Sequence, residues 1–391
     1  MPEPGATAKQ EHKDGYHNRI VSVMSDIKNP GPGKPARVSG TDSLGAARPA
    51  DKTAEANADR RPSRAVFSAL DLGTNNCRLL VARPQGGGFR IIDAFSRIVR
   101  LGEGLSRTGR LSDAAMDRAV DALKVCAHKI DRRRVTCLRS VATEACRIAD
   151  NADRFIARVY DETGLRLDVI SAGEEARLAV LGCQSLLVDD LSDALVFDIG
   201  GGSTELIHVR RTSGGYRIMA WISMPWGVIN LAERYDVRHA DEALFRTMVD
   251  EMRRALQAFG RDHGLDEVVA RGAVQLLGTS GTVTTLGSVY LQLPAYDRAK
   301  VDGLWIDSGD VRDLTWSVAR MSYDQRRAQP CIGDDRADLV VAGCAILEAI
   351  LSLWPAERLR VADRGIREGI LRGLMEQGPE VIMPPSVAAT L

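Results

Sequence analysis

From residue 65 onward, the pattern of apolar and polar positions predicts an α/β protein. Residues 65–84, AVFSALDLGTNNCRLLVARP, contain two β-type runs separated by Gly-Thr-Asn-Asn, a pattern typical of a strand, a tight turn and a second strand. Residues 85–101 indicate another turn and a third strand. A helix is expected after Ser112, a suitable N-cap, because apolar residues follow it at three- and four-residue spacing.

Strands and helices then alternate along the chain. The run VTCLRSVAT (135–143) predicts a strand, and a helix over about 152–163 is expected to end at Gly164. Residues 165–172, LRLDVISA, read as a strand, and residues 173–187 as a helix. Three strands followed by alternating helix and strand are typical of an α/β fold.

The opening pattern then occurs a second time. Residues 194–211, ALVFDIGGGSTELIHVRR, again predict a strand, a glycine-rich turn and a strand, with Asp198 at the position of Asp71 in the first copy. We therefore expect two related α/β domains that face one another, 64–190 and 191–375, the second including the C-terminal helical segments. A third glycine-rich turn follows an apolar strand in LLGTSGTVTTLG (276–287).

The two ends of the chain lack the apolar residues that a packed core requires. Residues 1–63 are expected to form a disordered extension, and residues 376–391 a loose tail. No signal peptide and no apolar run long enough to span a bilayer are found, and the seven cysteines are scattered, which favours a cytoplasmic protein.

Charge adds little to this picture. Lys plus Arg and Asp plus Glu both number 52, so the formal net charge is zero. Nothing therefore indicates nucleic acid or a membrane as a partner, and any anion site must come from local placement of charge. The sequence leaves open whether the chain forms a homodimer.

The first turn carries candidate phosphate-binding residues. A glycine in a tight turn lets the backbone approach a ligand, and the N–H groups of the turn can converge on an anion. The alternative is an ordinary hairpin that uses glycine and asparagine for turn geometry. The candidates are Asp71, Gly73, Thr74, Asn75 and Asn76.

The second turn is a stronger indication of a phosphate site. Three successive glycines, Gly200, Gly201 and Gly202, weaken a simple hairpin, and a backbone that lies against a phosphate explains them better. Ser203 belongs to the same candidate loop. Asp198 and Glu205 bracket the turn, and two carboxylates together with phosphate oxygens suit Mg²⁺, with Mn²⁺ as an alternative ion. A Walker A pattern is absent, which argues against a P-loop enzyme.

Two glutamates lie at a predicted helix start, S171-A-G-E-E-A. Ser171 and Glu174 have capping-box spacing, so Glu174 is expected to bond to the backbone and Glu175 to remain free. Backbone N–H groups at the helix start should favour the ionised form of Glu175, as a base acting on water requires. The alternative is that both glutamates only start the helix.

Further candidates are weaker on their own. Arg147, in the segment TEACR after a strand, is placed to hold a phosphate in a cleft, or else to lie in solvent at a helix start. Gly278, Ser280 and Gly281 of the third turn are candidates for binding part of a ligand.

Taken together, these segments resemble one known family. DLGTNNCRLLV, VATEACR, SAGEEARLAVLG, FDIGGGSTELI and GTSGTVTTL, in this order, closely resemble the exopolyphosphatase / guanosine pentaphosphate phosphohydrolase (Ppx/GppA) family. The resemblance covers about residues 64–375. It implies two ribonuclease H-like domains of the actin-like ATPase superfamily, with the active site in the cleft between them.

The resemblance also implies roles for the candidate residues. The loops Asp71–Asn76 and Gly200–Ser203 would bind phosphate, Asp198 and Glu205 would be linked to the metal, Glu175 would be the catalytic glutamate, and Arg147 would contact phosphate. The implied activity is metal-dependent release of terminal phosphate from polyphosphate or guanosine pentaphosphate. Rival interpretations are an actin-like small-molecule kinase and a non-catalytic nucleotide-sensing protein.

Two departures from the family pattern stand out. The first loop has Asn75-Asn76-Cys77 where many members have Asn-Ser-Phe, so one hydroxyl contact is replaced. Long members carry an additional C-terminal helical domain, and we expect this chain to be a short, two-domain member.

Overall fold

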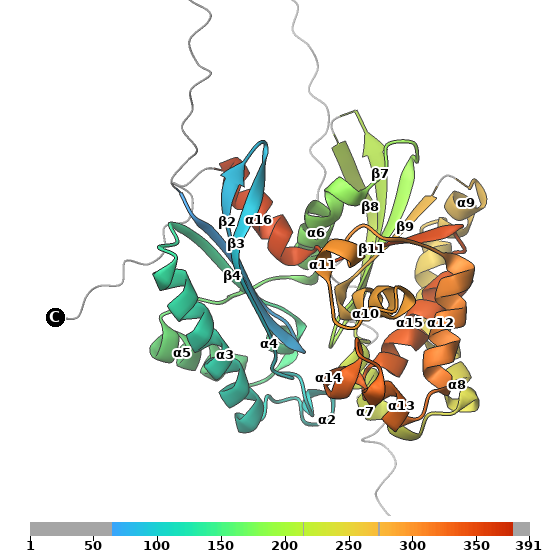
Figure 1. Cartoon of the computed structure of the whole chain (residues 1–391), viewed down its shortest axis with the longest axis horizontal. Coiled ribbons are helices and arrows are strands. Elements are labelled where there is room, and N and C mark those ends of the chain that lie inside the picture. Colours follow the sequence, from blue (N-terminus) through green and yellow to red (C-terminus); the bar gives the residue numbers. More distant parts are fainter. Residues whose placement is uncertain (1–64, 214, 273, 378–391) are drawn as a thin grey trace, which may run out of the picture. The chain divides into compact units, whose positions relative to one another are not determined.

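The computed structural model describes residues 65–213, 215–272 and 274–377 (Figure 1). The described residues fall within one compact unit, Arg60–Leu391. The predicted disordered extension, 1–63, lies outside them, as do residues 378–391 of the predicted loose tail. Residues 376 and 377, assigned to that tail, belong to the last helix instead.

The first sheet has five strands in the order β3-β2-β1-β4-β5. Strand β1 pairs antiparallel with β2 and parallel with β4. The strands are β1 (Phe67–Leu72), β2 (Asn76–Gln85), β3 (Gly88–Ile98), β4 (Cys137–Ala142) and β5 (Asp168–Val169). The strand expected over 165–172 is therefore only two residues long. Its apolar residues Leu165, Leu167 and Ile170 are buried, so the apolar pattern there reflects packing rather than strand pairing.

The second sheet repeats this arrangement. Its six strands have the order β10-β11-β9-β6-β7-β8, and β6 pairs antiparallel with β7 and parallel with β9, as β1 does with β2 and β4. The strands are β6 (Asp193–Ile199), β7 (Thr204–Thr212), β8 (Gly215–Met224), β9 (Val274–Thr279), β10 (Trp305–Asp307) and β11 (Arg358–Ala362). The expected α/β class and the internal repeat are confirmed.

Two helix ends have the capping residues expected from the sequence. Ser112 Oγ accepts a hydrogen bond from Ala115 N at 3.2 Å, and Gly164 ends its helix with a φ of 69°. The helices up to the second sheet are α2 (Leu105–Thr108), α3 (Asp113–Arg132), α4 (Glu144–Ile148), α5 (Ala152–Thr163) and α6 (Ala172–Cys183). The later ones are α7 (Val228–Arg234), α8 (Glu242–Asp262), α9 (Leu265–Ala270), α10 (Ser280–Tyr290), α11 (Arg298–Val301), α12 (Ser308–Arg320), α13 (Tyr323–Ala328), α14 (Gly333–Arg336), α15 (Val340–Leu353) and α16 (Ile366–Gln377).

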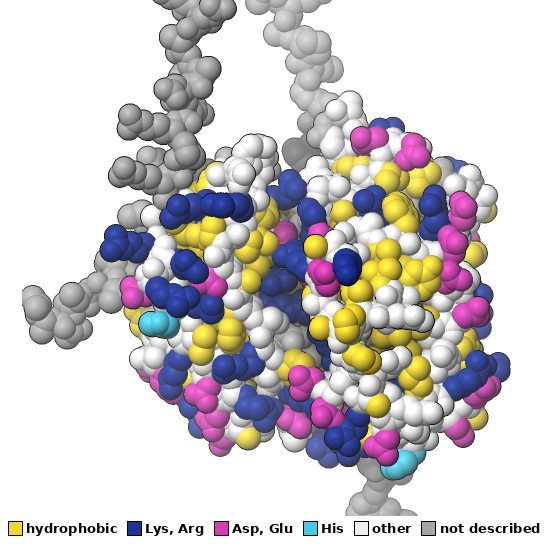
Figure 2. Space-filling model, in the orientation of Figure 1, with side chains coloured by type: hydrophobic (Ala, Val, Ile, Leu, Met, Phe, Trp, Pro, Cys, Tyr) yellow, Lys and Arg dark blue, Asp and Glu magenta, His cyan; other side chains and the backbone are white. Residues whose placement is uncertain are grey.

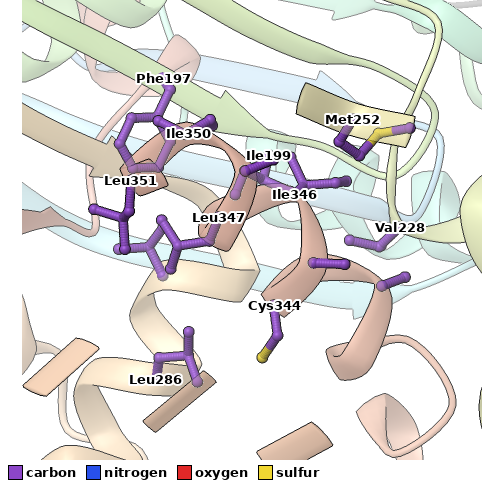
Figure 3. Packing of buried hydrophobic residues seen from close by; sticks show 14 of the residues in the cluster. Phe197, Ile199, Val228, Met252, Leu286, Cys344, Ile346, Leu347, Ile350 and Leu351 are labelled. Carbon is purple, nitrogen blue, oxygen red and sulfur yellow. The ribbon is translucent and has the colours of Figure 1, made fainter. Parts of the chain in front are cut away.

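Each sheet has its own apolar core on its outer face. Apolar residues of α3 and α5, such as Met116 and Phe155, pack with Leu70 and Leu79 of the first sheet. On the second sheet, α10 and α15 cover β6, and α8 packs against α15. Figure 3 shows Ile346 and Ile350 of α15 gathered against Phe197 and Ile199 of β6.

Helices α6 and α16 pack between the two sheets (Figure 1). Ile370 and Leu371 of α16 pack with Phe67 and Ala69 of β1, so the final helix, assigned to the second domain from the sequence, packs on the first sheet. The chain returns to that sheet because β1 and β2 present apolar residues on both faces. We call β1–β5 with α2–α5 and α16 the first lobe, and β6–β11 with α7–α15 the second lobe.

None of the helices in the described ranges is both long and apolar enough to cross a bilayer.

Candidate active site

The two predicted phosphate turns have the same backbone geometry. Gly73 N donates to Asn76 O at 2.9 Å in the first, and Gly200 N donates to Ser203 O at 2.9 Å in the second. Asp71 and Asp198 lie near the ends of the preceding strands, β1 and β6. We call these turns the first loop (residues 73–75) and the second loop (residues 200–203).

The two loops contact each other across the lobes, and this contact explains the glycines. A Cβ on Gly201 would lie 2.9 Å from Asn75 N, and a Cβ on Gly202 would lie 2.7 Å from Thr74 Oγ1. From the sequence alone, a bound phosphate is the expected reason for these glycines. In the structure, the close approach of the first loop already requires residues without side chains there.

A cavity of about 70 Å³ lies where the loops meet. This volume holds several waters. Its walls include Asp71, Asp198 and Glu175 together with the backbone of both loops. The expected site residues that line it are Asp71, Gly73, Thr74, Asn75, Asn76, Glu175, Asp198, Gly200, Gly201, Gly202, Ser203 and Ser280.

The third predicted turn is the junction of β9 and α10. Ser280 and Gly281 line a neighbouring cavity of about 50 Å³ at the start of α10, where unpaired backbone N–H groups favour an anion. Ser280 has a φ of 82°, a left-handed conformation that is uncommon for a residue other than glycine. Gly278 was expected to bind part of a ligand, but it lies within β9. A Cβ there would be 2.5 Å from the Phe197 ring, so packing explains the glycine.

Glu175 is buried in the first turn of α6, and 7% of its surface is exposed. Burial, followed by the charge of Glu205, raises its pKa well above the ordinary value of 4.5, and Arg147 opposes this shift. The expectation that the helix start would favour the ionised form is therefore wrong for this environment. A carboxyl with a raised pKa is better matched to proton transfer near neutral pH than an ordinary glutamate.

The side chain of Glu174 does not make the hydrogen bond expected in a capping box. Ser171 Oγ accepts from Glu174 N at 3.2 Å, as expected for an N-cap. The Glu174 carboxylate, however, accepts from Arg139 at 2.9 Å and from Arg177 at 2.7 Å rather than from the backbone of Ser171. Glu174 is not among the residues that line the 70 Å³ cavity, and hydrogen bonds from Arg177 and Arg139 lower its pKa against the effect of burial.

Arg147 lies behind Glu175. Its Nη1 donates to Glu175 Oε2 at 2.7 Å and to Ile170 O at 2.9 Å, and its Nε and Nη2 donate to Glu144 Oε2 at 3.1 and 2.6 Å. The structure thus places Arg147 as the partner of the candidate base. A direct contact with phosphate remains a prediction.

Comparison with known proteins identifies the group to which this site belongs. The Ppx/GppA phosphatase family matches the chain over residues 80–377. The chain belongs to the Ppx/GppA phosphatase family.

Solved structures agree with this assignment. A Ppx/GppA family member from Aquifex aeolicus superposes with a TM-score of 0.67 at 28% identity, covering 80% of this chain and 99% of that one. An exopolyphosphatase from Cytophaga hutchinsonii gives a TM-score of 0.70 at 25% identity, covering 80% and 98%. An exopolyphosphatase-like protein gives 0.70 at 28% identity, again covering 80% and 98%. The expected α/β fold of two related domains agrees with these neighbours, and the protein is a phosphatase.

Two acidic residues of this phosphatase suit a divalent cation. Asp198 and Glu205 are directly paired residues of β6 and β7, so their side chains lie on the same face of the sheet. Burial and the neighbouring Asp71 raise the pKa of Asp198 to about 6, although Arg78 opposes this shift. Burial and Asp198 raise the pKa of Glu205 to about 7, against hydrogen bonds from Ser223 and Ser203. A cation would relieve this crowding of carboxyl groups.

Asp198 and Glu205 alone would not fill the coordination shell of a divalent cation. Among the residues that the structure describes, no three His, Cys, Asp or Glu side chains are grouped so as to hold a metal ion. Mg²⁺ typically binds one or two carboxylates and completes its shell with water and substrate phosphates, so Asp198 and Glu205 fit this ion. Asp71 Oδ1 and Asn75 Oδ1 are also buried without a hydrogen-bond partner in this part of the chain, which is consistent with an additional ligand in the cavity.

Three arginines near the cavities were not singled out from the sequence. Arg78 lines the 70 Å³ cavity, Arg336 lines the cavity at α10, and Arg367 lines a third, of about 30 Å³, together with Arg78. Burial, together with the charge of Arg78, lowers the pKa of Arg336. Burial lowers that of Arg367, with Arg78 adding to the effect and Glu368 opposing it. Figure 2 shows Lys and Arg side chains gathered in a hollow near the middle of one face.

These arginines come from three separate elements, β2, α14 and α16. The segments that contain Arg336 and Arg367, RADLVVAG and GIREG, carry no glycine-rich turn after a strand that would indicate a phosphate site. They share a charged group that the fold places, partly buried, beside the cavities. That placement depends on tertiary structure, so local sequence does not reveal it.

Proposed function

We propose that this protein hydrolyses the terminal phosphoanhydride bond of inorganic polyphosphate or of guanosine pentaphosphate and releases orthophosphate. The observation that carries the proposal is the buried Glu175 carboxyl in one cavity with both glycine loops and Asp198. A binding protein would need the loops but not a buried base beside them. The membership of the chain in a phosphatase family supports the same reaction class.

Some residues of the site would bind the substrate, and others would take part in proton transfer. The backbone N–H groups of the two loops and of the α10 start would hold the terminal phosphoryl oxygens, and Arg78, Arg336 and Arg367 would neutralise the charge of the phosphates. These interactions would strengthen as charge develops in the transition state, because the groups are already fixed in place.

Glu175 would act as the general base. It would accept a proton from a water molecule, whose oxygen forms a bond to the terminal phosphorus while the bridging P–O bond breaks. The electron pair of that bond leaves with the shortened substrate, and the proton on Glu175 passes to a product oxygen or to solvent. Arg147 would keep the carboxylate directed at the water by its 2.7 Å hydrogen bond.

Mg²⁺, or Mn²⁺ in its place, would be held by Asp198 and Glu205. When bound, such an ion supplies charge neutralisation at phosphate oxygens and stabilises the leaving group.

Phosphate release tests the proposal directly. The purified chain is incubated with short polyphosphate, long polyphosphate or guanosine pentaphosphate, with no acceptor molecule, in Mg²⁺ and in EDTA. We expect orthophosphate from at least one substrate in Mg²⁺ and none in EDTA. Activity only when a small-molecule acceptor is added would indicate a kinase, and full activity in EDTA would exclude the metal-dependent form of the reaction.

A further inference from the structure

The segment that follows β3, residues 99–104, is attached to the first loop. Val99 N and Arg100 N donate to Asn75 O at 2.9 and 3.0 Å, and Gly102 N donates to Thr74 O at 3.0 Å. A Cβ on Gly102 would lie 2.2 Å from Thr74 Cγ2, so the Thr74 side chain packs directly against the backbone of Gly102. Movement of segment 99–104 would therefore move the first loop.

Helix α7 is attached to the second loop in the same way. Val228 N donates to Gly200 O at 3.0 Å, and Ile229 N donates to Gly201 O at 2.8 Å. Asn230 Nδ2 donates to Gly202 O at 2.8 Å. Each phosphate-binding loop thus has a supporting segment behind it, one in each lobe.

The two supporting segments are joined to the opposite lobe by charged side chains. Glu233 of α7 accepts from Gly104 N and from Ser106 Oγ, both at 2.7 Å. Arg100 donates to both carboxylate oxygens of Asp338, at 2.8 and 3.1 Å. These contacts gather α2, α7 and α14 at one edge of the molecule (Figure 1). Both links are charge-assisted, and the second is bidentate, which fixes direction as well as distance.

The backbone of Arg100 is adapted to this contact. Its φ is 46°, in the left-handed region that residues other than glycine rarely adopt. Such a conformation persists only where the surroundings hold it. Here the amide of Arg100 is bonded to the first loop while its guanidinium reaches Asp338 and the carbonyl of Asp335, which flank the cavity residue Arg336.

We propose that Arg100, Asp338 and Glu233 form an interlobe clasp that sets the spacing between the two phosphate-binding loops. They are positioning residues, because they line a separate cavity of about 400 Å³ and none of them lines the two cavities where the loops meet. The expected effect of the clasp on kinetics rests on the proposed phosphatase function. Its effect on lobe closure does not.

The clasp is suited to controlling how far the two lobes close, and it contributes little to the free energy of unfolding. The side chains of Arg100 and Asp338 are 31% and 16% exposed, and ion pairs that remain partly in water contribute little to the free energy of unfolding. The relative position of two lobes is a soft motion, however, and a small bias decides the population of the closed form. The apparent dissociation constant rises in proportion as the competent form is depopulated.

Kinetics should report this role as a change in KM. A phosphate substrate that contacts both loops itself holds the lobes together, so kcat at saturation should be nearly retained. If loss of the clasp reduces the closed form to about a tenth, KM rises about 10-fold. A variant that is merely misfolded would instead lower the amount of active enzyme and leave KM unchanged.

The experiment compares Asp338→Asn and Glu233→Ala with a matched control, Arg320→Gln. Arg320 pairs with Glu242 at 2.6 Å, but both residues belong to the second lobe. A swapped pair, Arg100→Asp with Asp338→Arg, tests rescue, and aspartate tolerates the left-handed conformation at position 100. KM and kcat for phosphate release are measured together with hydrogen exchange of residues 99–105.

We expect both clasp variants to raise KM about 10-fold and to speed hydrogen exchange of residues 99–105. The control should change neither quantity, and the swapped pair should restore part of the substrate affinity. An unchanged KM with unchanged exchange would overturn the clasp, as would a loss confined to kcat. If the wild-type protein releases no phosphate, the proposed function fails, and exchange alone decides: faster exchange in the variants retains the clasp, and unchanged exchange rejects it.

Discussion

At the scale of single residues, the site depends on how burial changes the chemistry of carboxyl groups. Glu174 and Glu175 are adjacent in sequence, yet their environments shift their pKa values in opposite directions. Two arginines hold Glu174 in its ionised form, whereas burial and the charge of Glu205 favour the protonated form of Glu175. Of these two glutamates, Glu175 is therefore the one suited to accept a proton from water.

This contrast predicts the effects of two matched substitutions. Glu175→Gln keeps the shape of the side chain and removes the base, so kcat should fall by roughly 10²–10⁴-fold. Glu174→Gln retains the N-cap, because Ser171 Oγ bonds to the backbone N of residue 174 and not to its side chain. Its kcat should remain close to that of the wild type.

The pH profile of kcat provides a second check on the same residue. The base acts in its deprotonated form, so activity is lost as pH falls through the raised pKa, and the acid limb should lie well above pH 4.5. A large loss of kcat in Glu174→Gln with none in Glu175→Gln would reverse the assignment.

At the scale of elements, the contact between α6 and α16 holds the two sheets together. A Cβ on Gly369 would lie 2.1 Å from the carbonyl oxygen of Leu178, and one on Gly182 would lie 2.0 Å from that of Gly365. The helices can approach this closely only because glycine is present on both sides of the crossing.

Gly369→Ala should therefore push α16 away from α6. Overpacking of this kind typically lowers the free energy of unfolding by about 1–3 kcal/mol. Gly373→Ala on the same helix is the control, because nothing lies within 4 Å of a Cβ there, and alanine has the higher helix propensity. Chemical denaturation of the two variants measures the difference; equal destabilisation would show that helix packing is not the cause.

These elements also show what local sequence pattern can and cannot predict. The paired turns at Asp71 and Asp198 were predicted because each is a contiguous strand–turn–strand signal, repeated along the chain. The return of α16 to the first sheet was not, because its partner β1 lies about three hundred residues earlier and nothing local specifies it. Likewise, the sequence favoured a bound phosphate as the reason for Gly201 and Gly202, whereas the close approach of the first loop from the other lobe already requires glycine there.

At the scale of the whole molecule, the distribution of positive charge bears on the length of substrate that can be held. A polyphosphate carries about one negative charge per unit, so processive degradation requires an extended basic surface. The formal net charge is zero. In the basic run at 132–134, Arg132 and Arg133 both donate to Asp93, so part of the charge of this run is neutralised. In the run 326–327, Arg326 is buried and Arg327 pairs with Asp334.

The arginines Arg78, Arg336 and Arg367 instead line the cavities at and beside the two loops, where we propose that the terminal phosphate binds. We therefore expect short polyphosphate or guanosine pentaphosphate to be preferred, and long chains to be shortened distributively, with release after each cleavage. Partial digestion of long polyphosphate, followed on a gel, measures this property. A gradual downward shift of all chains is the expected result, because the cleft holds only the end of the chain. Full-length chains persisting beside free phosphate, with no intermediates, would instead require a basic track outside the cleft and would contradict the expectation.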